Sequence, residues 1–212
     1  MATAGTKTTG TAATATEAAL GTRDRLVRTA SRLMQRGGYE NTPVKQLVRE
    51  AEATLGSLYH FFPGGKQELA VAAIHFGDEE FAGLLRIGLA AHPDPAQAVE
   101  GVAVLLAQAL EASDWRDGCP VTATALETIG RLPELQAACA TAFANWQHLV
   151  AAKLLASGCP EPDARDLAMT VINTLEGAEM TSQVTRSRTP LLVAGRHLAR
   201  LVASYGTASY GP

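Results

Sequence analysis

Residues 38–69 have the sequence GYENTPVKQLVREAEATLGSLYHFFPGGKQEL, and this stretch decides the fold. Thr42-Pro43 is predicted to open a short helix, because threonine is a favourable N-cap and proline suits the first helical position. The apolar residues that follow recur at helical spacing and give this helix one apolar side: Val44, Leu47, Val48 and Ala51. Residues 51–53 are expected to form a tight turn.

A second short helix is predicted after this turn. Thr54 can cap it, and we expect it to end near Tyr59 or His60. Leu58 and Phe62 are predicted to point into a small core. Two short helices joined by a tight turn form a helix-turn-helix, whose second helix lies in the DNA major groove.

This stretch resembles the DNA-binding domain of the tetracycline-repressor (TetR) family. The resemblance is carried by Gly38-Tyr39, Thr42, Val44, Leu47, Ala51, the run Gly56-Ser57-Leu58-Tyr59-His60, Phe62-Pro63 and Lys66. The doubled glycine at 64–65 and the segment GCPVTATALE at 118–127 resemble the LmrA-like branch. The resemblance implies a nine-helix, all-α fold, in which a three-helix DNA-binding domain precedes a helical body that binds a ligand and dimerises.

The rest of the chain also favours an all-α fold, because alanine dominates, aromatic residues make up 5% and alternating β-branched runs are nearly absent. Besides the two short helices, we predict helices at 22–36, 66–91, 95–113, 121–129, 133–156, 161–187 and 189–204. The predicted organisation is a disordered segment 1–17, a DNA-binding domain 18–66, a ligand-binding and dimerisation domain 67–205, and a flexible tail 206–212.

The charge is distributed unevenly along the chain. Its net value is only −3, but the part through Lys66 holds nine Lys and Arg against five Asp and Glu, and the remainder holds nine against sixteen. A basic first part on an acidic body is typical of a protein with a DNA-binding head and a body that must not bind DNA. Five arginines lie between residues 23 and 36, and most of them fit a solvated helix face equally well.

Ten residues are candidates for DNA contact. Thr42, Lys45 and Gln46 lie at or near the start of the first short helix, where a hydroxyl, an ammonium or an amide can meet a phosphate or a base edge. Lys66 opens the following long helix and is expected to clamp a phosphate. The candidates on the second short helix are Thr54, Leu55, Gly56, Ser57, Tyr59 and His60.

Two positions depart from the pattern that the resemblance implies. Glu52 stands where the family usually has glycine, and a non-glycine residue with a positive φ would cost roughly 1 kcal/mol there. Leu55 stands where relatives often have Lys or Arg, which removes a polar contact and makes the recognition surface more apolar. Both changes bear on DNA affinity and on the operator sequence.

A single short recognition helix makes few base contacts, so a two-fold dimer that binds a palindromic operator is expected. The last two helices are the predicted interface, and Gly177 and Gly195 would let helices approach closely. The predicted apolar stripes are Leu167, Val171, Leu175 and Ala178 on one helix and Leu191, Leu192, Leu198, Leu201 and Val202 on the other. Core packing within one chain explains the same stripes equally well.

The body is predicted to bind a small, mostly apolar aromatic effector, and the resemblance implies drug-like or flavonoid-like molecules. Asn173 is informative, because an amide on an apolar helix face needs a hydrogen-bonding partner that a ligand can supply. Such stripes more often form plain core. The candidate ligand contacts are Phe81, Leu85, Phe143, Trp146, Asn173, Gly177 and Met180.

Other functions have less support in the sequence. Cys119 precedes a helix start, where a thiolate could be stabilised for redox sensing. The enzyme motifs HExxH, GxSxG, GxGxxG and the Walker loop are absent, and a structural adaptor would leave residues 56–62 unexplained. Three widely spaced cysteines predict neither a disulfide framework nor a zinc site. We therefore expect a cytoplasmic, ligand-responsive repressor without cofactor, metal or membrane contact.

Overall fold

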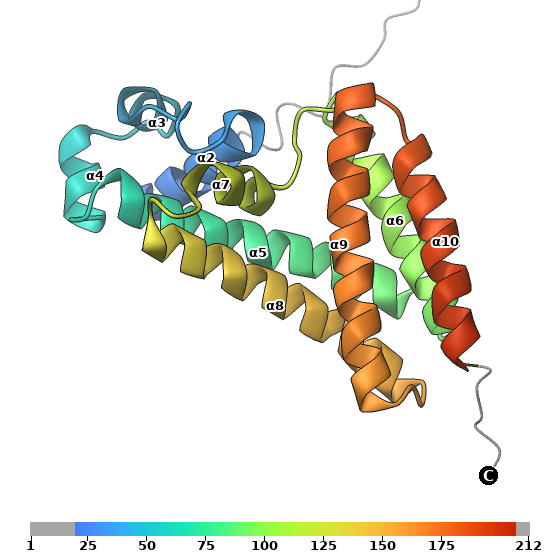
Figure 1. The fold of residues 1–212 in the computed structure, drawn as a ribbon. Coiled ribbons are helices and arrows are strands. Elements are labelled where there is room, and N and C mark those ends of the chain that lie inside the picture. Colours follow the sequence, from blue (N-terminus) through green and yellow to red (C-terminus); the bar gives the residue numbers. More distant parts are fainter. Residues whose placement is uncertain (1–19, 207–212) are drawn as a thin grey trace, which may run out of the picture.

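The computed structural model describes residues 20–206, and within this range the chain forms nine α-helices and no strand (Figure 1). The helices are α2 Thr22–Gly37, α3 Val44–Glu50, α4 Leu55–Phe61, α5 Lys66–Ala90, α6 Pro95–Ala112, α7 Pro120–Thr128, α8 Pro133–Ala156, α9 Glu161–Thr185 and α10 Thr189–Gly206. The predicted all-α fold is confirmed. The segment 1–17 lies outside the described residues, as does the tail 206–212 apart from Gly206.

Most helix ends follow from local sequence signals. Asp94 caps α6, where its Oδ1 accepts a hydrogen bond of 2.8 Å from the amide of Gln97. Gly38 stops α2 with a φ of 75°, a conformation that glycine adopts without strain. The start of α3 is a correction: Pro43 is the extended residue before the helix, so Thr42 is not its N-cap.

Helices α2, α3 and α4 form the head at one end of the molecule (Figure 1). Leu26, Leu47, Leu58 and Phe62 are buried and form its small core, which confirms the inward orientation predicted for Leu58 and Phe62. Helix α5 begins at the head and continues into the body for 25 residues, a length of roughly 37 Å. The predicted division between 18–66 and 67–205 falls in the first turn of α5 and stays a prediction.

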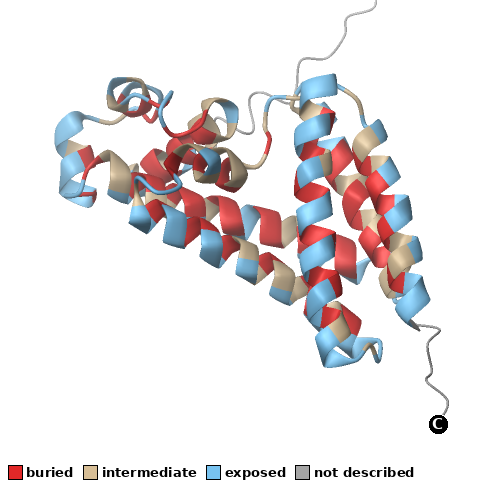
Figure 2. Cartoon of the chain, viewed as in Figure 1, coloured by how far each residue is buried: buried red, intermediate tan, exposed pale blue. Residues whose placement is uncertain are grey.

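The body consists of two groups of helices. Helices α5 and α8 run alongside each other, and α6, α9 and α10 pack together at the far end (Figure 1). The short helix α7 contacts both α2 and α8, so it joins the head to the body. Buried residues line the facing sides of all these helices (Figure 2). No helix within residues 20–206 has the length and apolar character that a membrane span requires.

The leucine and valine stripes predicted as a dimer interface need correction. Leu167, Val171 and Leu175 on α9 are buried within one chain. On α10, Leu191, Leu198 and Val202 are buried too, because α10 packs on α6 and α9 of the same chain. The remaining members, Ala178, Leu192 and Leu201, are half-buried against this core. The buried members therefore belong to the intramolecular core, and the place of the three half-buried members in an interface stays a prediction.

Candidate functional site

The outer side of α4 combines exposed apolar and polar groups. Leu55 and Tyr59 are 45% and 54% exposed, although both are large hydrophobic side chains. Thr54, Gly56 and His60 are exposed as well. This surface is held outward because Leu58, on the opposite side of the helix, is wholly buried.

The first turn of α4 is fixed by its cap, as the sequence predicted. The Oγ1 of Thr54 accepts a hydrogen bond of 3.0 Å from the amide of Ser57 and lies 2.9 Å from the Ser57 Oγ. The two hydroxyls therefore share one of their hydrogen atoms and keep lone pairs for another donor. A Cβ added to Gly56 would meet no atom closer than the Thr54 Oγ1, at 3.6 Å. The backbone of Gly56 is therefore open to close approach by another molecule.

The three candidates on and before α3 differ in their accessibility. Lys45 is exposed, and the amide of Gln46 donates to Glu50 at 2.9 Å. Thr42 is buried, and its hydroxyl donates a hydrogen bond of 2.8 Å to the carbonyl oxygen of Gly38. The predicted contact of this hydroxyl with phosphate is therefore corrected: Thr42 stabilises the connection between α2 and α3.

Lys66 has an aromatic partner within the head. Its ammonium nitrogen lies 4.2 Å from the centroid of the Tyr39 ring, in the geometry of a cation–π contact. Burial lowers the pKa of Lys66 below its ordinary value. Lys66 thus lies directly after the turn that follows α4, and its ammonium group packs on the ring of Tyr39.

The turn between α3 and α4 depends on an arginine that the sequence pattern placed on a basic helix face. Arg25 donates from Nε to the carbonyl oxygen of Ala51 at 3.0 Å and from a terminal nitrogen to that of Glu52 at 3.3 Å. A third hydrogen bond, of 2.9 Å, reaches the carbonyl oxygen of Leu20. One guanidinium therefore ties α2 to the turn, a role that periodicity alone does not indicate.

Glu52 has a φ of 49°, the left-handed conformation suspected from its departure from glycine. Replacing Glu52 with glycine is expected to raise the free energy of unfolding by up to about 1 kcal/mol, because the strain of a Cβ at this φ is removed. Urea denaturation measures this change. The control is Glu52→Gln, which removes the same charge but keeps the strain, and equal stability of the two variants would contradict the strain.

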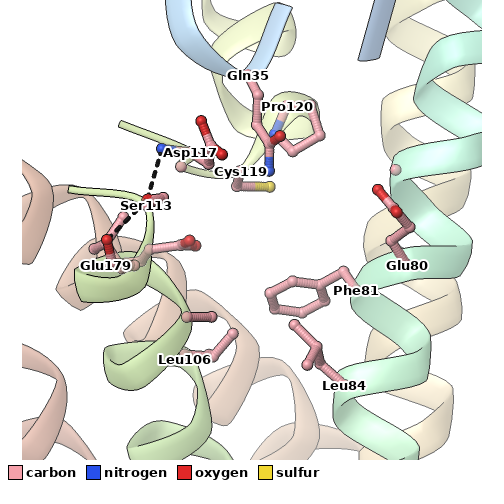
Figure 3. Close-up of a pocket in the computed structure, with 14 residues that line it drawn as sticks. Gln35, Glu80, Phe81, Leu84, Leu106, Ser113, Asp117, Cys119, Pro120 and Glu179 are labelled. Carbon is pink, nitrogen blue, oxygen red and sulfur yellow. Dashed lines mark hydrogen bonds between the residues drawn. The ribbon is translucent and has the colours of Figure 1, made fainter. Parts of the chain in front are cut away.

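A cavity of about 450 Å³ lies at the junction of head and body. Figure 3 shows Phe81, Leu84 and Glu80 projecting from α5 on one side, with Cys119, Asp117 and Glu179 opposite. The complete lining comes from α2, α5, α6, the residues around the start of α7, and α9: Gln35, Gly77, Glu80, Phe81, Leu84, Leu106, Ala109, Leu110, Ser113, Asp117, Gly118, Cys119, Pro120 and Glu179. This volume suits a small organic molecule.

The predicted ligand contacts divide between this cavity and other places. Phe81 lines the cavity, and Leu85 is buried in the core. Trp146 is wholly buried and packs against Phe81 and Phe143, with ring centroids 4.3 and 5.2 Å apart. Its indole N–H donates to the carbonyl oxygen of Asp78 at 3.4 Å. Trp146 thus belongs to the core behind the cavity wall.

The three predicted contacts on α9 do not join the aromatic residues of α8. Asn173 and Gly177 are exposed, and Met180 borders a second cavity of about 120 Å³ that adjoins the first. The prediction that Asn173 and Gly177 line one ligand site together with Trp146 is therefore corrected. The helical phase of α9 turns Asn173 toward the outside, while Glu176 and Glu179 point inward.

Glu176 and Glu179 are cavity residues that the sequence pattern did not single out. Both side chains are buried, one turn apart on α9, and both line the cavities. Thr122 donates a hydrogen bond to one oxygen of Glu176. Among the described residues, the Oε1 of Glu176 and the Oε2 of Glu179 have no hydrogen-bonding partner. Burial, followed by the charge of Glu176, raises the pKa of Glu179 to about 8.

Cys119 lies beside these carboxyl groups. Burial first, and then the charges of Glu176 and Glu179, raise the pKa of its thiol well above the ordinary value. A redox sensor requires a thiolate, so this environment counts against the redox alternative. The Sγ accepts a long hydrogen bond of 3.5 Å from the amide of Thr122, which caps α7.

Three polar contacts join the head to the body around α7. Arg36 on α2 forms a bidentate pair with Asp117, at 2.6 and 3.3 Å. The amide of Glu40 donates to the carboxylate of Glu127 at 3.0 Å, and the carboxylate of Glu40 pairs with Arg131. The residues around α7 therefore touch both the cavity and the segment between α2 and α3.

The chain matches known regulators over most of its length. Residues 26–73 match the model of bacterial regulatory proteins of the tetR family, and residues 95–197 match that of the LmrA/YxaF-like transcriptional regulator C-terminal domain. The uncharacterized HTH-type regulator YxaF of Bacillus subtilis (strain 168) is 33% identical over 87% of this chain and 96% of its own length. The HTH-type regulator LmrA of the same organism is 33% identical over 80% and 90%.

Solved structures agree with this relationship. A TetR transcriptional regulator from Chloroflexus aurantiacus J-10-FL has a TM-score of 0.72 and 26% identity, over 86% of this chain and 94% of that chain. The regulatory protein TetR from Rhodobacter sphaeroides shares the fold with a TM-score of 0.75 at 24% identity, over 84% and 97%. The chain therefore belongs to the TetR family of bacterial transcriptional regulators, and it is a DNA-binding regulator with an LmrA/YxaF-like C-terminal domain, not an enzyme.

Proposed function

We propose that this regulator is a repressor that binds a palindromic operator as a homodimer and leaves it when a small molecule enters the body. The DNA-reading surface is the exposed side of α4, from Thr54 to His60, together with Lys45 on α3. Leu55 offers an apolar contact for a thymine methyl group, and Tyr59 offers a hydroxyl to a phosphate. This activity would take place in the cytoplasm, where bacterial DNA lies.

The position of the larger cavity is the observation that supports an effector site in the body. Its wall includes Gln35 from the head, Phe81 from α5 and Glu179 from α9. It also includes Asp117, which forms the ion pair with Arg36 of the head. A molecule that fills this space would shift the head relative to the body, and so favour a dimer whose heads no longer fit the operator.

The proposed dimer interface is the outer side of α9. The apolar members Met169, Met180 and Val184 are 50%, 52% and 80% exposed, and Asn173 and Gly177 lie between them at helical spacing. A Cβ on Gly177 would have nothing within 4 Å, whereas one on Gly195 would lie 2.6 Å from the Cβ of Ala103 on α6. Gly195 thus serves packing within the chain, and Gly177 is open to a second copy.

Replacing Tyr59 with alanine is expected to weaken operator binding at least tenfold, because each head then lacks one phosphate-binding hydroxyl and an exposed ring on the recognition helix. Fluorescence anisotropy measures the affinity, on DNA that the wild-type protein selects from random sequence. Tyr59→Phe separates the hydroxyl from the ring. The matched control is Ile87→Ala, which truncates an exposed apolar side chain of the body.

The dependence of affinity on salt provides a second measurement. Lys45→Ala should reduce the log–log salt slope by about one unit for each phosphate that the protein no longer neutralises. Lys66→Ala should weaken binding with a smaller change in slope if the wild-type ammonium remains on Tyr39. Unchanged affinity and slope in the Tyr59 and Lys45 variants would place the DNA-binding surface elsewhere.

A further inference from the structure

We propose that the effector is an organic cation, held by the carboxyl groups of Glu179 and Glu176 and by the aromatic face of Phe81. This inference rests on the proposed function, because it takes the cavity between head and body as the effector site. The sequence predicted a mostly apolar aromatic effector. The effector inferred here is also aromatic, but it carries a positive charge.

The first argument is the unmatched acidity of the two cavities. Among the described residues, no Lys, Arg or His lines either cavity. Asp117 is neutralised by the bidentate pair with Arg36, but Glu176 and Glu179 have no cationic partner in the lining. A buried carboxylate without a countercharge is costly, and this cost keeps Glu179 protonated below its raised pKa. A cationic ligand would supply the missing countercharge and stabilise the ionised carboxylate.

The second argument is the pair of unsatisfied carboxyl oxygens. Glu179 lines both cavities and Glu176 the smaller one, and each has a buried oxygen without a partner in residues 20–206. Buried polar atoms in folded proteins are almost always satisfied, so two orphaned oxygens one helical turn apart indicate a missing donor or cation. Thr122 and Cys119 already interact with Glu176, so the carboxyl group of Glu179 is the freer anchor.

The third argument is the apolar wall opposite these acids. Phe81 and Leu84 on α5 face the side of the cavity that holds Glu179 (Figure 3). An aromatic face attracts a cation, and apolar side chains bind the hydrophobic part of an amphipathic molecule. The cavity of about 450 Å³ has room for a bicyclic aromatic ring that carries one ammonium group.

Three probes with the same aromatic body and different charges test the inference: 2-naphthylmethyl-trimethylammonium, 2-naphthylmethanol and 2-naphthylacetate. We expect isothermal titration calorimetry to show that the cation binds at least ten times more tightly than the alcohol, and the anion more weakly still. In Glu179→Gln the affinity for the cation should fall at least tenfold, while that for the alcohol should stay the same. The matched control is Glu161→Gln, on an exposed glutamate of the same helix.

The dependence of binding on pH gives an independent readout. The probe is a permanent cation, and Glu179, whose pKa is about 8, must lose its proton to pair with it. Affinity should therefore rise with pH, by up to tenfold per unit between about pH 6 and 8, as binding releases a proton. The other titratable groups in the lining are Glu80, Asp117, Cys119 and Glu176. Glu179→Gln should abolish most of this rise.

The possible outcomes separate this inference from the proposed function. Preference for the cation, abolished in Glu179→Gln, supports the inference. Equal or tighter binding of the alcohol, unaffected by Glu179→Gln, overturns the cationic class but leaves the cavity as the effector site. Binding of none of the probes overturns the inference as well. Operator binding by the wild type, and its weakening in Tyr59→Ala, test the regulator independently.

Discussion

Replacing Trp146 with alanine is expected to lower the free energy of unfolding by about 3–5 kcal/mol, the usual cost of deleting a large buried aromatic side chain. Trp146 is wholly buried on α8, and its ring lies 4.3 Å from that of Phe81 on α5. The substitution also removes the hydrogen bond from the indole N–H to the Asp78 carbonyl oxygen. Because α5 and α8 form the long pair of the body, the substitution should affect global unfolding.

Urea denaturation followed by far-ultraviolet circular dichroism measures this effect without depending on tryptophan fluorescence. Trp146→Phe keeps an aromatic ring and should lose much less stability. Ile87→Ala, which truncates an exposed side chain of α5, is the surface control. A Trp146→Ala variant with normal stability and no effector affinity would instead make Trp146 a wall of the effector site.

The second large effect is expected for Gly177→Glu, which should convert the proposed dimer to a monomer. Operator affinity should then fall by roughly 10²–10⁴-fold, because the two heads would no longer bind as one unit. Within one chain the substitution is tolerated, since a Cβ on Gly177 has nothing within 4 Å. Removing a glycine from a helix interior even favours the helix by up to about 1 kcal/mol. Only a second copy packed on this face would make the charge costly.

Size-exclusion chromatography with light scattering measures the assembly at micromolar concentration. The matched control is Gly83→Glu on α5, because the Cβ position of Gly83 is equally open. Leu198→Glu provides a contrast: Leu198 is buried within the chain, so its variant should unfold rather than dissociate. A folded, dimeric Gly177→Glu protein with normal operator affinity would place the interface elsewhere.

Local sequence signals anticipated much of the helical framework. Proline and the caps Thr54 and Asp94 predicted helix starts, and α8 has the bounds 133–156 that were expected. Thr42 shows the limit of this approach. Its type suits an N-cap, but the fold buries it and directs its hydroxyl to the carbonyl oxygen of Gly38.

The amino-acid sequence by itself determined the helical class, most helix bounds and the helix-turn-helix, because caps, helix breakers and the 3.6-residue period act over a few residues. The tertiary structure alone decided which side of each helix is used. Helix α9 has apolar residues on two sides, and packing against α6, α8 and α10 buries Leu167, Val171 and Leu175 while leaving Met180 exposed. The same packing turns Glu176 and Glu179 inward beside Cys119, which lies more than fifty residues earlier in the chain. Whether a side chain is buried depends on neighbours that are distant in the chain, and no local sequence pattern specifies these neighbours.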